Sequence, residues 1–156
     1  LNDALDALNR LTEGIHYVKK AIEINPNEPE YWYVFAEVQE KLGFIEEASQ
    51  AYQRVIELDY SDYDVWLDYS RLLHHNNDLS DAIGTLFEGI KKFPDVAELY
   101  YRAAILVMLD NQRKESLHLI EKALSMDYEK HNEIFEYAPL LKNDAEILNL
   151  ISAYRK

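Results

Sequence analysis

The residue types best suited to chemistry in this sequence are its histidines and its many carboxylates. Two histidines, His74 and His75, are adjacent, and imidazoles are common metal ligands. On a helix, however, neighbouring side chains diverge by about 100°, so these two cannot hold one ion together. The other histidines stand alone in polar stretches, at His16, His118 and His131. The sequence therefore predicts no metal ligands and no cofactor.

Paired carboxylates, which could act as general acid and general base, occur at Glu46 with Glu47 and at Asp62 with Asp64. With 29 acidic residues among 156, such pairs are expected without any catalytic role. A general acid also needs a pocket that raises its pKa, and no pattern in the sequence marks one. Cysteine is absent, which excludes thiolate metal sites and cysteine nucleophiles. We expect a protein that is not an enzyme.

The net charge of −13 limits the classes of partner. Residues 1–78 hold 16 acidic and 6 basic side chains (net −10), whereas residues 79–156 hold 13 and 10 (net −3). An acidic surface repels phosphate, so we expect no nucleic-acid partner. A basic or amphipathic protein segment fits better than an acidic one. No apolar run reaches the roughly 20 residues that span a membrane, and we expect a cytoplasmic protein.

The elements that carry these residues repeat with a period of 34 residues. Three frames, 29–62, 63–96 and 97–130, follow one another without insertion or deletion. A large aromatic residue stands at the fourth place, and mostly small residues stand at the twentieth and twenty-seventh. The fourth place holds Trp32, Trp66 and Tyr100, the twentieth holds Ala48, Ala82 and Ser116, and the twenty-seventh holds Val55, Gly89 and Ala123. Such a period predicts stacked units that share a core.

Each frame is predicted to hold two antiparallel helices that meet where side chains are small. Apolar spacing predicts helices over 30–42 and 45–58, with Gly43 ending the first of them. Asn76 to Asp78 and Asp110 with Asn111 are expected to turn the chain in the next two frames, because Asn tolerates positive φ. The fourth-place aromatics are expected to lie buried between successive helix pairs.

The frame also runs backward into residues 1–28, where Gly14 takes the place of Ala48 and Pro26 that of Pro94. This segment is predicted to be the end of one helix followed by the whole second helix of a truncated repeat. The sequence starts without methionine, so we expect it to be a piece of a longer chain.

Residues 131–156 are predicted to form an atypical C-terminal cap. A short helix begins there, and Pro139 is expected to break it. A final helix is expected at about 144–155, capped by Asn143 or Asp144.

These patterns resemble the tetratricopeptide repeat (TPR) family, and the likeness covers nearly all of residues 7–130. The motif residues that match are Trp32, Phe35, Ala36, Gly43, Ala48, Tyr52 and Val55, with Trp66, Tyr69, Ser70, Ala82 and Pro94 in the next frame. Tyr60 and Tyr128 depart from the pattern, since they stand where Pro26 and Pro94 close the other repeats. The resemblance implies an all-α, right-handed superhelical α-solenoid of antiparallel helix pairs with a C-terminal capping helix.

In TPR arrays the first helix of each pair lines a concave groove, and this resemblance implies which side chains face a partner. The implied groove is acidic, with an aromatic residue at one end and apolar residues at the other. Its partner-binding residues would be Tyr33, Glu37, Glu40, Leu67, Asp68, Arg71, His74, Tyr101, Arg102, Ile105 and Met108. Ile105, Met108 and Leu109 are either a contact patch or a surface that the C-terminal segment covers.

The resemblance implies a non-enzymatic scaffold that holds a protein or peptide segment in this groove. The alternative is a regulatory or substrate-docking arm of a larger enzyme whose catalytic part lies outside residues 1–156. Some TPR proteins grip chaperone C-termini with a lysine, asparagine and arginine clamp, but among the corresponding places only Arg102 matches. The oligomeric state stays open, although the apolar edge of the truncated repeat could pair two copies as a fragment-induced dimer.

Overall fold

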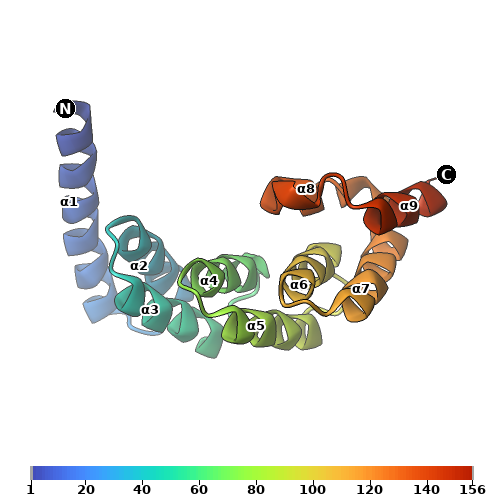
Figure 1. Ribbon diagram of the computed structural model, residues 1–156. Helices are drawn as coiled ribbons and strands as arrows, with labels where there is room; N and C mark the ends of the chain where they lie inside the picture. The colour runs from blue at the N-terminus through green and yellow to red at the C-terminus, as the bar shows by residue number, and fades with distance from the viewer. Residues whose placement is uncertain (1, 156) are drawn as a thin grey trace. The chain divides into compact units, whose positions relative to one another are not determined.

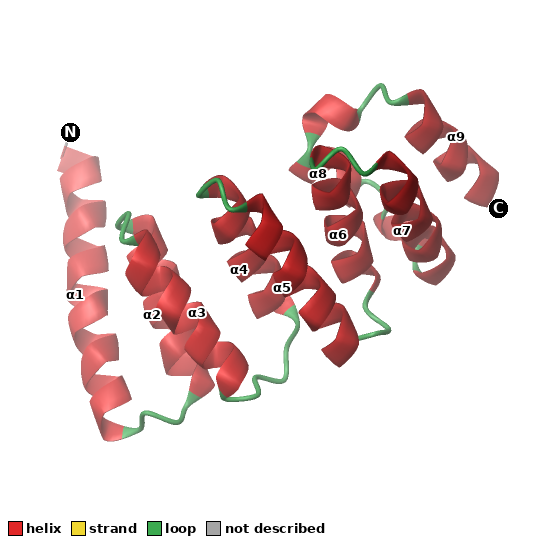
Figure 2. Cartoon of the chain, turned by 60° about the horizontal axis from the view of Figure 1, so that its bottom comes forward, coloured by secondary structure: helices red, strands yellow, loops and turns green. Residues whose placement is uncertain are grey.

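A computed structural model describes residues 2–155, and in this range the chain consists of helices and loops without a strand (Figures 1 and 2). The chain divides into two compact units, with the boundary between Asn76 and Asn77. Unit 1 holds α1 (Asn2–Ile24), α2 (Pro29–Lys41), α3 (Ile45–Glu57) and α4 (Asp64–His75). Unit 2 holds α5 (Leu79–Lys92), α6 (Ala97–Leu109), α7 (Arg113–Met126), α8 (Glu133–Tyr137) and α9 (Ala145–Tyr154). Two short 3-10 helices, Tyr128–Lys130 and Pro139–Leu141, flank α8.

Unit 1 is a row of packed helices. α2 and α3 form a tight pair, α1 packs against α2, and α3 packs against α4. The pair can approach closely because small side chains meet there, and Ala36 and Ala48 are completely buried. Gly43 joins the two helices with a φ of +85°, a conformation that residues with a Cβ rarely adopt. The predicted stop at this glycine is confirmed.

The ends of α3, α4 and α6 are each followed by a short polar residue in the left-handed conformation. Asn77 and Asn111 both have a φ of 61°, as expected from their sequence position. Asp59 also has a φ of 61°, and this turn was not anticipated. Asp78 accepts a hydrogen bond from the Asp81 amide at 3.3 Å and caps α5.

Residues 1–28 differ from the expectation of two helices. α1 runs without a break from Asn2 to Ile24. Asn9 stands at the place of Gly43, yet it remains helical. The stretch from Asp3 to Leu11 contains neither glycine nor proline, and its alanines and leucines favour helix. The residues that were predicted to end a separate first helix therefore belong to the same continuous helix, α1, as the predicted second one.

The fourth-place aromatics are buried to different degrees. Trp66 is 7% exposed, whereas Trp32 and Tyr100 are partly buried. The two partly buried residues make equivalent hydrogen bonds in their own repeats. Trp32 Nε1 donates to the Pro26 carbonyl at 2.8 Å, and Tyr100 Oη donates to the Pro94 carbonyl at 2.9 Å. Each aromatic thus fixes the loop that precedes its own helix. The small places are tightly packed, since Ala48, Ala82, Ser116 and Ala123 are completely buried.

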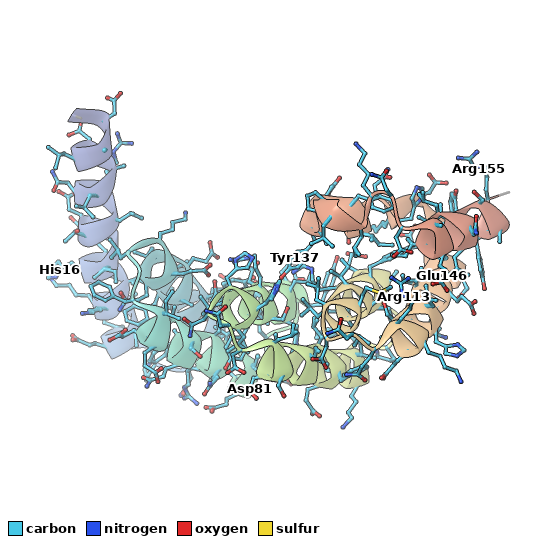
Figure 3. All side chains as sticks on the ribbon, in the orientation of Figure 1. His16, Asp81, Arg113, Tyr137, Glu146 and Arg155 are labelled. Atoms are coloured by element: carbon cyan, nitrogen blue, oxygen red, sulfur yellow. The ribbon has the colours of Figure 1, made fainter. Side chains whose placement is uncertain are left out.

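The C-terminal segment folds as a cap on unit 2. α8 ends at Tyr137, two residues before Pro139, and Asp144 caps α9 by accepting a hydrogen bond from the Ile147 amide at 3.2 Å. Arg113 of α7 anchors α9 through ion pairs with Asp144 at 2.8 Å and with Glu146 at 3.1 Å (Figure 3). The chain thus leaves the helix just before Pro139, and of the two expected cap residues, Asn143 and Asp144, it is Asp144 that caps α9.

Candidate functional site

An acidic groove lies in unit 1, where side chains of α2 and α4 meet. Its volume is about 520 Å³, and four carboxylates, two tyrosines and two aliphatic side chains line it. The lining residues are Glu30, Tyr33, Val34 and Glu37 of α2, Tyr60 of the loop that precedes α4, and Asp64, Leu67 and Asp68 of α4. Four of the expected partner-binding residues, Tyr33, Glu37, Leu67 and Asp68, therefore share one surface.

Helical spacing explains how these side chains come together. Glu30, Tyr33 and Glu37 are three or four residues apart on α2, so they lie on one face of that helix. Asp64 and Asp68 have the same relation on α4. Each helix thus presents two carboxylates to the groove.

Tyr33 closes the floor of the groove. Its side chain is only 8% exposed, and its hydroxyl donates a short hydrogen bond to Asp68. The ring meets Tyr60 edge-on at 5.5 Å and Tyr52 at 6.0 Å between centroids. Burial, followed by the hydrogen bond and the charge of Asp68, raises the pKa of Tyr33 well above its ordinary value. Tyr33 therefore stays a neutral donor to Asp68.

Beside the groove, Glu40 and Arg71 bind each other, although the sequence suggested that both face a partner. The guanidinium makes a short bond to one carboxylate oxygen and a second bond of 3.3 Å to the other. Tyr52 also donates to Glu40 at 2.8 Å, and Asp68 lies 3.7 Å from Arg71. Burial alone would raise the pKa of Glu40, but the hydrogen bonds from Arg71 and Tyr52 lower it. This pair holds α2 and α4 together and neutralises one negative charge.

The groove itself keeps its negative charge. Its lining, as far as the chain is described, includes Glu30, Glu37, Asp64 and Asp68 and no basic residue. Partial burial, and then the nearby charge of Asp68, raise the pKa of Glu37. Desolvation and the neighbouring carboxylate thus disfavour the charged form of Glu37 more than Lys41 and Arg71 favour it. A cation in the groove would favour the charged form.

Family models identify the architecture. A model described as "Tetratricopeptide repeat" matches residues 33–97, and a second model with the same description matches residues 3–28. The chain belongs to the TPR family. Its all-helical fold is the α-solenoid of helix pairs that this family forms. TPR proteins serve in general as protein-interaction scaffolds and are typically not catalytic.

Solved structures with the same fold share little sequence with this TPR chain. MamA is 16% identical, with 99% of this chain and 92% of MamA covered and a TM-score of 0.68. YrrB, a TPR protein with an unusual peptide-binding site, is 13% identical over 97% and 80% of the chains, with a TM-score of 0.64. TTC0263, a thermophilic TPR protein in Thermus thermophilus, is 19% identical over 97% and 92%, with a TM-score of 0.59. No curated protein matches the sequence.

The expected apolar end of the TPR groove is not on the surface. Tyr101, Ile105 and Met108 are 0%, 1% and 8% exposed, so the prediction that they bind a partner is wrong. They lie in the core of unit 2 with residues of the C-terminal segment: Ile134, Ala138, Leu141, Ile147 and Ile151. The C-terminal segment covers the patch, which settles the alternative that the sequence left open. Tyr101 also donates to the Asp127 carbonyl at 2.8 Å.

The remaining expected groove residues have local partners. The Arg102 guanidinium lies 4.0 Å from the centroid of the Tyr137 ring, a cation–π contact that ties α6 to α8. His74 is partly buried, and the centroid of its ring lies 5.4 Å from the centroid of the His75 ring. Within residues 2–155, no group of three or more His, Cys, Asp or Glu side chains could hold a metal ion. No helix in this range is long and apolar enough to cross a membrane.

Tyr60 and Tyr52 are aromatic residues of this site that sequence reasoning did not place there. Tyr60 stands at the repeat place that is proline at Pro26 and Pro94. That departure from the repeat was a usable signal, since a tyrosine in a closing loop can reach into a groove. Tyr52 was expected in the core, and its hydroxyl gives it a second role as a donor to Glu40.

Proposed function

We propose that this TPR protein is a non-catalytic scaffold and that its acidic groove holds a basic segment of another protein. One observation carries the proposal: a groove of about 520 Å³ with four carboxylates and no basic residue among its described lining residues. Residues 29–62, 63–96 and 97–130 are proposed as the repeats, with 131–156 as the cap.

Electrostatics favour a lysine- or arginine-containing segment. Unlike charges a few Å apart at a protein surface attract, whereas an acidic peptide meets like charges on both helices. A cation near Glu37 would also offset the repulsion that Asp68 exerts on that carboxylate. The same repulsion of anions argues against a nucleic-acid partner.

The non-polar part of the lining suits the stem of a long basic side chain. The rings of Tyr33 and Tyr60 line the groove and add aromatic surface that can attract a cation. Val34, which is 49% exposed, and Leu67 can contact the methylene groups of lysine or arginine. YrrB is described as having a peptide-binding site, which supports peptide recognition by a protein of this fold.

Peptide titration tests the proposal. An arginine- and lysine-rich peptide, its glutamate-substituted counterpart and an uncharged peptide are compared by calorimetry at low salt. The basic peptide should bind the chain, and Glu37→Gln should weaken it by about three- to tenfold because one carboxylate is lost. Glu47→Gln is the matched control, because Glu47 is exposed on α3 and does not line the groove.

Comparison of the two variants separates groove binding from general attraction to an acidic protein. Both variants lose one negative charge, so a non-specific interaction would weaken equally in both. Equal effects, or tighter binding of the acidic peptide, would contradict the proposed function.

A further inference from the structure

Two contacts between α2 and α4 show how the two walls of the acidic groove align. Tyr33 bonds to Asp68, and further along both helices Glu40 bonds to Arg71. Because both contacts advance in the same direction along the chain, α2 and α4 run parallel, next to each other in unit 1 (Figure 1). The Tyr33–Asp68 bond therefore gives a common reference level on the two helices.

Glu30 and Asp64 lie at the same level, before this bond, and form the N-terminal pair. Glu30 precedes Tyr33 by three residues, and Asp64 precedes Asp68 by four. At about 1.5 Å per residue, both lie roughly 5 Å before the bond. Burial, and then nearby carboxylates that include Glu30 and Asp64, raise the pKa of Tyr60. Both members of the pair therefore lie near one side chain of the groove.

Glu37 and Asp68 form the C-terminal pair. Glu37 follows Tyr33 by four residues, which places it about 6 Å beyond the bond. Partial burial, and then the charge of Asp68, raise the pKa of Glu37, so these two carboxylates lie close together. Asp68 is held in place by Tyr33 and by Arg71.

An apolar belt separates the two pairs. Val34 directly follows Tyr33, and Leu67 directly precedes Asp68, so both lie near the level of the bond. Both side chains line the groove, and Val34 is 49% exposed. One cation cannot reach both pairs across this belt, because an ion pair needs contact within about 4 Å. The groove thus offers two separate sites for positive charge.

The distance between the pairs fits two side chains of an extended segment. Asp64 and Asp68 are about 6 Å apart along α4, and both have short side chains. Glu30 and Glu37 are about 10 Å apart along α2, but they are longer, exposed side chains that can lean toward the centre of the groove. In an extended strand, residues i and i+2 point to the same face about 6.4–6.8 Å apart. This spacing matches the α4 wall.

Other backbone conformations fit the groove less well. Two turns of helix with side chains are about 10–12 Å wide and about 11 Å long, or roughly 900–1,200 Å³, which exceeds the groove volume of about 520 Å³. A polyproline II segment places residues i and i+3 on one side about 9.3 Å apart, which is about 3 Å longer than the α4 wall. An extended strand is therefore the best match.

We propose that the groove recognises two basic side chains two residues apart in an extended segment, a Lys/Arg-x-Lys/Arg pattern. This inference rests on the proposed function and adds the spacing that the partner must have. One cation lies at the N-terminal pair and the other at the C-terminal pair, while their methylene stems cross Val34 and Leu67. The residue between them points away from the groove, so its type is not selected.

Peptides of equal charge and different lysine spacing test this pattern. Each peptide has neutral capped ends, a background of serine and threonine, and two lysines at i with i+1, i+2, i+3 or i+4; a fifth peptide carries one lysine. NMR titration of the ¹⁵N-labelled chain at low salt measures their affinities. The i, i+2 peptide should bind at least about fivefold more tightly than each of the others, because only this peptide engages both pairs at once.

Removal of one carboxylate from either pair should reduce this preference. Glu30→Gln and Glu37→Gln should each weaken the i, i+2 peptide by about three- to tenfold and lower its advantage over the i, i+1 peptide to less than about twofold. The single-lysine peptide should weaken by no more than about twofold, because the other pair remains open to it. Glu47→Gln is the matched control, since Glu47 is exposed on α3 outside the groove, and it should leave the preference unchanged. Circular dichroism of each variant checks that the helices remain.

The outcomes separate this inference from the proposed function. Equal binding of all four two-lysine peptides, with weaker binding to Glu37→Gln but not to Glu47→Gln, would overturn the spacing and leave the basic partner in place. A preference for i, i+3 or i, i+4 would overturn the extended conformation. A preference that persists in both Glu30→Gln and Glu37→Gln would show that the two pairs do not cause it. Failure of every lysine peptide to bind would overturn the proposed function together with this inference.

Discussion

The Tyr33 hydroxyl donates a hydrogen bond to the Asp68 carboxylate, and this contact joins α2 to α4 across 35 positions of sequence. It lies at the floor of the acidic groove, where Tyr33 is almost completely buried. Asp68 also lies 3.7 Å from Arg71, which in turn binds Glu40. A tyrosine donor and an arginine cation together hold one groove carboxylate in place.

Tyr33→Phe removes this bond while keeping the ring and its aromatic contacts. We expect a loss of about 1–2 kcal/mol in the free energy of unfolding, because the Asp68 carboxylate loses a partly buried donor. Urea denaturation followed by circular dichroism measures the change. Tyr31→Phe is the control, since Tyr31 is exposed on the same helix. An equal effect of the two substitutions would show that the bond contributes nothing to stability.

Glu40→Gln tests the ion pair with Arg71 and gives stability a defined dependence on pH. The folded protein lowers the pKa of Glu40, so the carboxylate binds its proton more weakly folded than unfolded. The Glu40 charge therefore makes its full contribution to stability above the ordinary glutamate pKa of about 4.3. This contribution is lost as the pH falls through the lower pKa that Glu40 has in the folded protein.

At pH 7 the variant should be less stable than the native chain by about 1–3 kcal/mol, because a charge-assisted hydrogen bond is replaced. Denaturation curves at several pH values between about 7 and 3 measure the difference. The two proteins should converge at the acid end. A difference that stays constant with pH would mean that packing of the side chain, and not its charge, stabilises the fold.

Glu37→Gln should have the opposite effect on stability. The pKa of Glu37 is raised, so its charge costs stability once the pH rises above the ordinary glutamate value and through the folded one. The variant should be slightly more stable at pH 7, by less than about 1 kcal/mol for this exposed side chain. A melting temperature that rises while binding of the basic peptide weakens would identify Glu37 as a binding residue. A melting temperature that falls would contradict this role.

Periodicity was sufficient to predict the helix pairs, because a 34-residue repeat of aromatic and small residues reports directly on close helix packing. The turn at Gly43 and the cap at Asp144 followed from local backbone chemistry. The continuous α1 did not follow, since the repeat suggested a break where no residue stops the helix. Local signals therefore outweighed the repeat at the N-terminal edge.

The sequence alone did not predict which residues far apart in the chain contact each other. Glu40 and Arg71 were both expected to face a partner, yet they are 31 positions apart and bind each other. The burial of Ile105 and Met108 depends on where the C-terminal segment packs, and helical spacing carries no information about that. The assignment of a groove residue from a repeat pattern is correct only where no other segment of the chain covers that residue.

Substitution of the two tryptophans tests whether burial at the fourth place of the repeat determines stability. Trp66→Ala should reduce the free energy of unfolding by about 3–5 kcal/mol, because Trp66 is only 7% exposed and its removal leaves a cavity. Trp32→Ala should cost less, about 1–2 kcal/mol, since Trp32 is partly exposed and its hydrogen bond goes to a loop carbonyl. The chain has two tryptophans, so each variant keeps one as a fluorescence probe of unit 1. Equal losses in urea denaturation would show that burial at this place does not determine stability.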